Sequence, residues 1–188
     1  HIKKFNPTFV KVLVRYNPEA DRATNLRQLE KLKLLNDYLK SVNSKFLFEL
    51  LVQATANQLS EFGGDKESYD LHLRPKLMVR AMGEIQHYGI LPDLWKLEGV
   101  ERIEDAKLLV KQAQSVPKKA GIITLGRGES INKVGEWLKV GAHTNGIVGF
   151  AVGRTIFWDA IEKFHKGTFD RSQAINQIAD NYSSFVKL

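Results

Sequence analysis

Three charged residues lie inside short apolar segments of this chain, where an unpaired charge would be costly. Lys11, Glu49 and Lys96 each have apolar neighbours on both sides. Burying a charge is unfavourable by several kcal/mol unless the charge is paired or has a chemical role. A primary amine with a second cation and a carboxylate nearby has the groups needed to form and break an imine with a carbonyl compound. The three residues therefore predict Schiff-base chemistry of the kind that class I aldolases perform.

Lys96 is the expected imine-forming residue, with Lys11 as the second cation and Glu49 as a general acid and base. Schiff-base formation requires an unprotonated amine, a state that burial and a neighbouring cation both favour. Glu49 has no polar neighbour in sequence, so it must meet a cation or hold a proton, and either state suits proton transfer. A structural alternative stays open, in which Glu49 only neutralises the lysines. Lys96 could then pair with Glu49, or with Glu98, which shares its face of the strand.

Glycine–arginine sequences follow the last two apolar segments, as Gly126-Arg127-Gly128 and Gly153-Arg154. Glycine lets backbone N–H groups approach an anion, and arginine can add a bidentate contact. Two such loops on consecutive strands predict a phosphate site, and the alternative is that these glycines only permit tight turns. The candidate substrate-binding residues are Leu125, Gly126, Arg127, Gly153, Arg154, Arg15 and Glu98.

Alternating strand and helix patterns must position these groups. The expected strands are residues 9–16, 45–52, 93–98, 121–126 and 146–152. The expected helices are residues 25–41, 69–88, 103–116, 130–142, a helix beginning near 154, and 171–186. Thr24 is the expected N-cap of the first helix. Pro75 fits the first turn of a helix that starts near Arg74. The second strand should lead into a long polar loop around Gly63-Gly64.

This alternation predicts a single α/β domain with a parallel sheet. Chemistry in a βα barrel occurs at the C-terminal ends of the strands, where the charged and glycine-rich residues lie in this sequence. A barrel of this class needs eight strands, and five strand–helix units are visible. We therefore expect either an open sheet or the larger part of a (β/α)8 TIM barrel whose N-terminal portion is missing.

Composition argues against several other kinds of site. The net charge is +7, but the basic residues are scattered rather than gathered on one stripe, so nucleic-acid binding is not expected. The chain has no cysteine, and its five histidines lack ligand spacing, so no metal site and no cofactor are expected. No apolar stretch approaches the roughly 20 residues of a membrane span. Together with the absence of a leader pattern, this predicts a cytoplasmic protein.

Five strings of residues, spread over essentially the whole chain, resemble a known family. They are residues 5–18 (FNPTFVKVLVRYNP), 73–77 (LRPKL), 93–99 (DLWKLEG), 125–129 (LGRGE) and 149–158 (GFAVGRTIFW). They are similar to the aldolase-type domain of bacterial myo-inositol catabolism, which is often fused behind a 5-dehydro-2-deoxygluconokinase. More distantly, the chain is similar to class I tagatose-bisphosphate aldolase, a TIM barrel.

The resemblance implies roles for particular residues. It gives the Schiff base to Lys96, the second lysine to Lys11, the acid/base carboxylate to Glu49, and the terminal phosphate motif to Gly153 and Arg154. The visible strands would be the fourth to eighth of the barrel, so residues 1–188 would be the C-terminal portion of one aldolase-type domain.

The resemblance also implies a substrate and partners. The reaction would be cleavage of 2-deoxy-5-keto-gluconate 6-phosphate to dihydroxyacetone phosphate and malonate semialdehyde. An N-terminal kinase domain in the same polypeptide and a homo-oligomer are expected. The alternatives are a tagatose-bisphosphate aldolase, a sugar-phosphate isomerase that forms no imine, and a non-catalytic barrel that regulates or assembles an attached sugar kinase.

Overall fold

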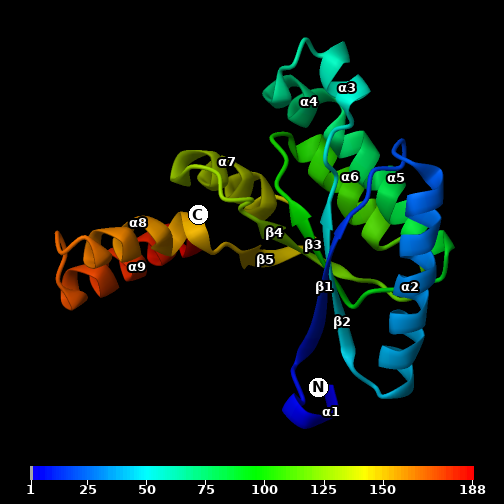
Figure 1. The fold of residues 1–188 in the computed structure, drawn as a ribbon, viewed down its shortest axis with the longest axis horizontal. Helices are drawn as coiled ribbons and strands as arrows, with labels where there is room; N and C mark the ends of the chain where they lie inside the picture. Colours follow the sequence, from blue (N-terminus) through cyan, green and yellow to red (C-terminus); the bar gives the residue numbers. More distant parts are fainter. Residues whose placement is uncertain (1) are drawn as a thin grey trace.

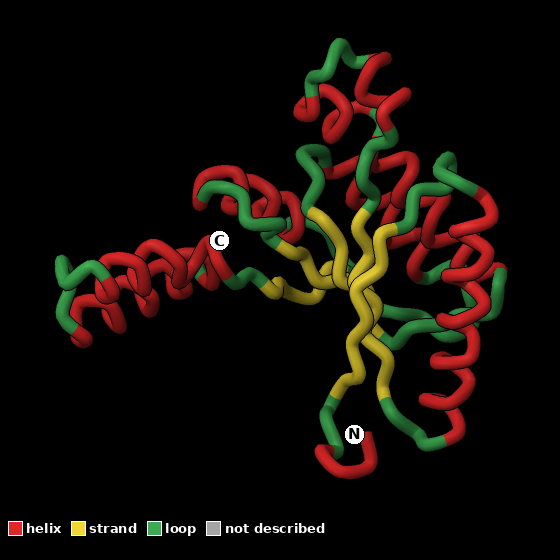
Figure 2. Tube along the Cα trace, viewed as in Figure 1, coloured by secondary structure: helices red, strands yellow, loops and turns green. Residues whose placement is uncertain are grey.

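The computed structural model describes residues 2–188, and all strands of this part of the chain belong to one parallel sheet. The strands follow chain order from edge to edge, and Figure 2 shows them side by side. Their bounds agree with the expected strands to within one residue at each end: β1 Phe9–Arg15, β2 Lys45–Leu51, β3 Leu94–Glu98, β4 Gly121–Leu125 and β5 Ile147–Ala151. The predicted α/β fold with five parallel strands is thus confirmed.

One short helix precedes β1, and the other helices connect successive strands or follow the last strand. They are α1 Ile2–Phe5, α2 Arg22–Ser41, α3 Ala56–Glu61, α4 Lys66–His72, α5 Arg74–His87, α6 Ile103–Ala113, α7 Ile131–Ala142, α8 Arg154–His165 and α9 Arg171–Val186. The start of α5 is as predicted, because Pro75 lies in its first turn, where no intrahelical N–H donor is needed. No helix within residues 2–188 is long and apolar enough to cross a membrane.

Two expectations about local structure are wrong. The N-cap of α2 is Asp21 and not Thr24, because the Asp21 carboxylate accepts a hydrogen bond from the Thr24 backbone N–H. The stretch after β2 is not one long loop but contains α3 and α4, which Thr55 and Asp65 cap. These helices have only 6 and 7 residues, too few to display an apolar period.

One face of the sheet packs under helices and forms the main core. Phe46, Phe48 and Leu50 alternate along β2 and are all buried against this layer. The ring of Phe48 lies 5.0 Å from that of Trp95 on β3. Each such side chain contributes about 1.5–3 kcal/mol of burial free energy. In Figure 1, α2, α5 and α6 lie together on this side of the sheet.

The opposite face of the sheet is largely open. Leu13 of β1 is 43% exposed and Val148 of β5 is 67% exposed, although both lie within strands. Beyond β5, helices α8 and α9 form a hairpin that projects from the rest of the molecule (Figure 1). A small second core joins this hairpin to α7 and β5 through Ile156, Phe185 and Val134. The charged strand residues all lie on the open face.

Candidate active site

Strand register brings the charged residues of three strands into one neighbourhood. Glu49 of β2 pairs in register with Lys96 of β3 on one side and with Leu13 of β1 on the other. Lys11 lies two residues before Leu13 on β1 and therefore on the same face. All three charges thus lie on the face of the sheet opposite the main core.

The Glu49 carboxylate bridges the two lysines. Lys11 Nζ lies 2.7 Å from Glu49 Oε2, and Lys96 Nζ lies 3.0 Å from Glu49 Oε1. This confirms the expectation that Glu49 lies within hydrogen-bond reach of a lysine. The Glu49 side chain is 8% exposed, that of Lys96 is 18% exposed and that of Lys11 is 48% exposed. Burial alone would raise the pKa of Glu49, but hydrogen bonds from Lys11 and Lys96 lower it below its usual value.

A cavity of about 360 Å³ opens above Lys96 and Glu49, at the C-terminal ends of the strands. Arg15 at the end of β1 and Arg154 at the start of α8 line it, and neither guanidinium has a hydrogen bond or ion pair to another described residue. The cavity lining is Leu13, Arg15, Glu49, Leu51, Lys96, Leu125, Gly126, Arg127, Gly128, Ala151, Gly153, Arg154 and Phe157. Lys96, Glu49 and six of the seven candidate substrate-binding residues therefore border one space. Glu98 does not line it, and Lys11 reaches it only through Glu49.

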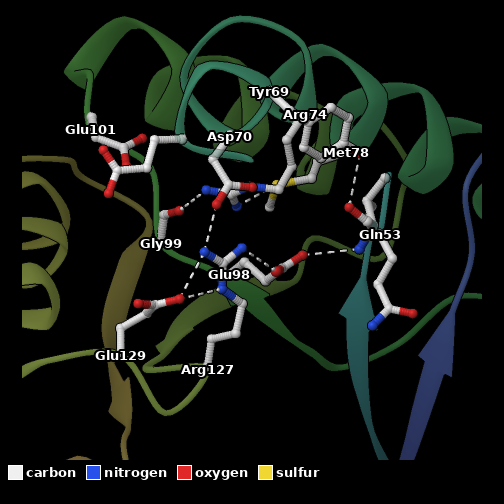
Figure 3. Close-up of polar contacts among 12 residues, drawn as sticks. Gln53, Tyr69, Asp70, Arg74, Met78, Glu98, Gly99, Glu101, Arg127 and Glu129 are labelled. Atoms are coloured by element: carbon white, nitrogen blue, oxygen red, sulfur yellow. Dashed lines mark hydrogen bonds and ion pairs between the residues drawn. The ribbon is translucent and has the colours of Figure 1, made fainter. Parts of the chain in front are cut away.

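Arg127 lies in this lining but is held by carboxylates. Its guanidinium contacts Glu98 at 3.2 Å and Glu129 at 2.9 Å, and it also donates to Asp70. Figure 3 shows these side chains converging on Arg127 from three segments of the chain. Burial alone would lower the pKa of Arg127, but the contacts with Asp70 and the other carboxylates raise it. Most donors of Arg127 are occupied, so it stabilises the loop rather than offering a vacant anion contact.

Glu98 is occupied in the same cluster. It accepts hydrogen bonds from the Val52 backbone N–H at 2.9 Å and from Arg127. Glu98 therefore joins the end of β2 to the loop after β4, and the alternative in which it pairs with Lys96 is not what the structure shows.

Asp70 and Arg74 complete this cluster, and both were missed by the sequence reasoning. Arg74 is fully buried, donates to Asp70 at 2.9 Å and donates to the Gly99 carbonyl at 2.9 Å. The signal that could have found them is their separation of four residues within the expected helix 69–88, a spacing that places an acid and a base side by side. In the structure they face each other across the junction of α4 and α5.

The loop after β4 and the start of α8 lie against each other. Gly128 has a φ of +82°, and a Cβ built there would lie 2.9 Å from Arg154 Nη2. The Thr155 hydroxyl donates to the Glu129 carbonyl at 2.8 Å, which ties the first turn of α8 to this loop. The N-cap of α8 is Gly153, and no side chain in the described part of the chain caps this helix. Backbone N–H groups at such a helix start lack intrahelical partners and favour an anion.

Within residues 2–188, no group of three or more His, Cys, Asp or Glu side chains is arranged to hold a metal ion. The arrangement instead offers an amine beside a carboxylate, and the cavity lining adds the guanidinium groups of Arg15 and Arg154, which no other described residue pairs. This combination can bind an anionic carbonyl compound and present its carbonyl to Lys96.

Comparison with known sequences gives a family for the chain. No curated protein matches it. The sequence model of one family, described as "Uncharacterized protein conserved in bacteria (DUF2090)", matches residues 5–188. That match includes every strand and every residue of the cavity. The chain therefore belongs to the bacterial family DUF2090.

Proposed function

We propose that this protein is a class I aldolase that cleaves a phosphorylated keto-sugar through a Schiff base on Lys96. The observation that carries the proposal is the Glu49 carboxylate placed between Lys96 and Lys11 at the floor of a cavity whose Arg15 and Arg154 have no partner within residues 2–188. Arg15 and Arg154 line the same space as exposed side chains without a partner among the described residues, so their guanidinium groups are available to an anionic ligand.

The chemistry assigned to Lys96 begins at its Nζ atom. Glu49 accepts a proton from the ammonium group, the free amine attacks the substrate carbonyl carbon, and loss of water gives an iminium ion. A base then removes the proton of the hydroxyl on the carbon two bonds from the iminium carbon. The carbon–carbon bond breaks, an aldehyde leaves, and the electron pair moves into an enamine. Protonation and hydrolysis return the ketone product and the free Lys96.

Lys11 influences these reaction steps through Glu49. Its ammonium group, 2.7 Å from Glu49, stabilises the carboxylate form and so keeps a proton acceptor beside Lys96. Lys11 is thus a positioning residue in this mechanism, and Glu49 carries the proton transfers.

The phosphate group of the substrate is assigned to the side of the cavity formed by Arg154 and the start of α8, away from Lys11. Arg154 offers a guanidinium, and the first turn of α8 offers N–H groups beside Gly153. Gly126 and Gly128 keep the neighbouring loop free of side-chain atoms at this point. Arg127 supports the site indirectly, because its carboxylate partners hold that loop in place.

We further propose that the five strands are the fourth to eighth of a (β/α)8 barrel. The open face with exposed Leu13 and Val148 supports this, since further strands would enclose it. The substrate implied by the family resemblance is 2-deoxy-5-keto-gluconate 6-phosphate, which would give dihydroxyacetone phosphate and malonate semialdehyde. A fused kinase domain, a homo-oligomer and a cytoplasmic location belong to the same proposal.

Turnover assays on matched lysine variants test this function. Release of dihydroxyacetone phosphate is followed with a coupled dehydrogenase, using the full-length protein. Lys96→Arg keeps a cation beside Glu49 but cannot form a carbinolamine, so turnover should be lost while the thermal midpoint stays near that of the wild type. Lys107→Ala, at an exposed lysine of α6, is the control and should keep full activity. Turnover that survives in Lys96→Arg would contradict the proposed mechanism.

A further inference from the structure

Two arginines of the cavity lie on opposite flanks of the residue proposed to form the imine. Arg15 ends β1, which is one edge of the sheet, and Arg154 follows β5, which is the other edge. Lys96 lies on β3, the middle strand. The two edge strands are four interstrand spacings apart, about 19 Å along the sheet. The order across the cavity is therefore cation, amine, cation.

Arg15 also lies at the level of the cavity mouth, measured along the strands, where a ligand would bind. Its register partner is Leu51, two residues beyond Glu49 on the same face of β2. The Arg15 side chain thus lies one layer above Glu49, toward the C-terminal mouth where the loops of Arg154 and Gly128 also lie. Leu13 and Leu51, the adjacent residues on this face, offer it no opposite charge.

The charge of the cavity lining does not balance within the protein. Glu49 already faces two lysines, and Arg127 already faces three carboxylates. Arg15 and Arg154 remain without a partner among the described residues. A ligand with a single phosphate at Arg154 would leave Arg15 unmatched, whereas one with an anionic group at each end would match both.

We propose that Arg15 binds a second oxyanion of the substrate, at the end remote from the phosphate held by Arg154. The substrate is then an open-chain keto-sugar with an anionic group at both ends, and its carbonyl lies between them near Lys96. The second oxyanion is a carboxylate or a phosphate. This assignment rests on the proposed function, because it uses the position of Lys96 as the reacting amine.

Binding calorimetry tests the role of Arg15 separately from the reaction, because the ligands used have no ketone or aldehyde and cannot form an imine with Lys96. The probes are glucitol 6-phosphate, with one anionic group; 6-phosphogluconate, with a phosphate and a carboxylate; and mannitol 1,6-bisphosphate, with two phosphates. The variants are Arg15→Gln and Arg154→Gln. The control is Arg22→Gln, which removes the same charge from an exposed residue outside this cavity.

Arg15→Gln should weaken binding of at least one doubly charged probe by about tenfold or more, since a charge-assisted hydrogen bond is lost. It should change the affinity for glucitol 6-phosphate by less than about twofold, the effect of a distant charge. Arg154→Gln should weaken all three probes, and Arg22→Gln none. A larger loss with 6-phosphogluconate identifies the oxyanion as a carboxylate, and a larger loss with the bisphosphate identifies it as a phosphate.

Equal loss for all three probes in Arg15→Gln, or no loss for any, would overturn the assignment. So would failure of the wild-type protein to bind either doubly charged probe. These outcomes are independent of the reaction, because no probe can react with Lys96. Tight binding of a doubly charged probe without turnover would count against the aldolase and leave the role of Arg15 standing.

Discussion

Removing the Arg127 guanidinium should strongly destabilise the fold, because it leaves buried carboxylates without their cation. In the Arg127→Met variant, Glu98 keeps only the Val52 N–H, and its side chain is 3% exposed. Asp70 is less affected, since Arg74 remains 2.9 Å away. Glu129 is 34% exposed, so the loss of its contact with Arg127 should change the free energy of unfolding only slightly.

The magnitude follows from the burial of the carboxylate that loses its partner. Removing one member of a buried ion pair costs about 3–5 kcal/mol of unfolding free energy. This is a large part of the roughly 5–15 kcal/mol that stabilises a typical domain. Urea unfolding, followed by tryptophan fluorescence, should show a midpoint lower by more than about 1 M.

A second substitution separates this cause from lost packing. Glu98→Gln in the Arg127→Met background removes the uncompensated charge and should recover part of the stability. Lys163→Met is the matched control, because its ion pair with Asp159 is exposed and should be worth less than about 1 kcal/mol. A loss below about 1 kcal/mol in Arg127→Met, or a further loss in the double variant, would show that an uncompensated Glu98 charge is not what destabilises the fold.

Two further predictions concern the carboxylate and the glycine of the site. The pKa of Glu49 is lower in the folded chain, so its contribution to stability is full above the unfolded-state value of about 4.3 and is lost as pH falls through the folded-state value. Thermal melts from pH 6 to pH 3 should decline less steeply in Glu49→Gln, and an identical decline would contradict the pairing. Gly128→Ala places a Cβ at a φ of +82° and 2.9 Å from Arg154 Nη2, so it should lower stability by about 1–3 kcal/mol and weaken phosphate binding. Unchanged phosphate affinity in a folded Gly128→Ala variant would contradict the contact between this loop and Arg154.

The strands and the meeting of charges could be predicted from sequence because each depends on a strong local pattern. Apolar segments bounded by glycine and polar residues identify the strands, and alternation of side chains identifies the face on which Lys96 and Glu49 lie. Parallel pairing then brings the C-terminal ends of the strands to the same edge of the sheet. The expectation that Glu49 would meet the lysines followed from the cost of leaving it alone in an apolar strand.

The partners of Arg127 could not be predicted, because they come from segments without a clear pattern. Asp70 lies on α4, a helix of 7 residues that the sequence pattern does not separate from α5, and only the tertiary fold brings it to Arg127. The sequence interpretation treated Gly126-Arg127-Gly128 as an anion loop, and a glycine–arginine string does not reveal whether carboxylates already occupy the arginine. Similarly, Glu98 shares a face with Lys96 but turns toward Val52 N–H and Arg127.

Reductive trapping tests whether Lys96 forms an imine with the ketone. The full-length protein is incubated with dihydroxyacetone phosphate and sodium borohydride, digested, and analysed by peptide mass spectrometry. A reduced adduct is expected on the peptide that contains Lys96, and it should be absent without the ketone and absent in Lys96→Arg. No adduct in the folded wild-type protein, or an adduct on another lysine that persists in Lys96→Arg, would contradict the proposed imine, and a sugar-phosphate isomerase or a non-catalytic barrel would then explain the site better.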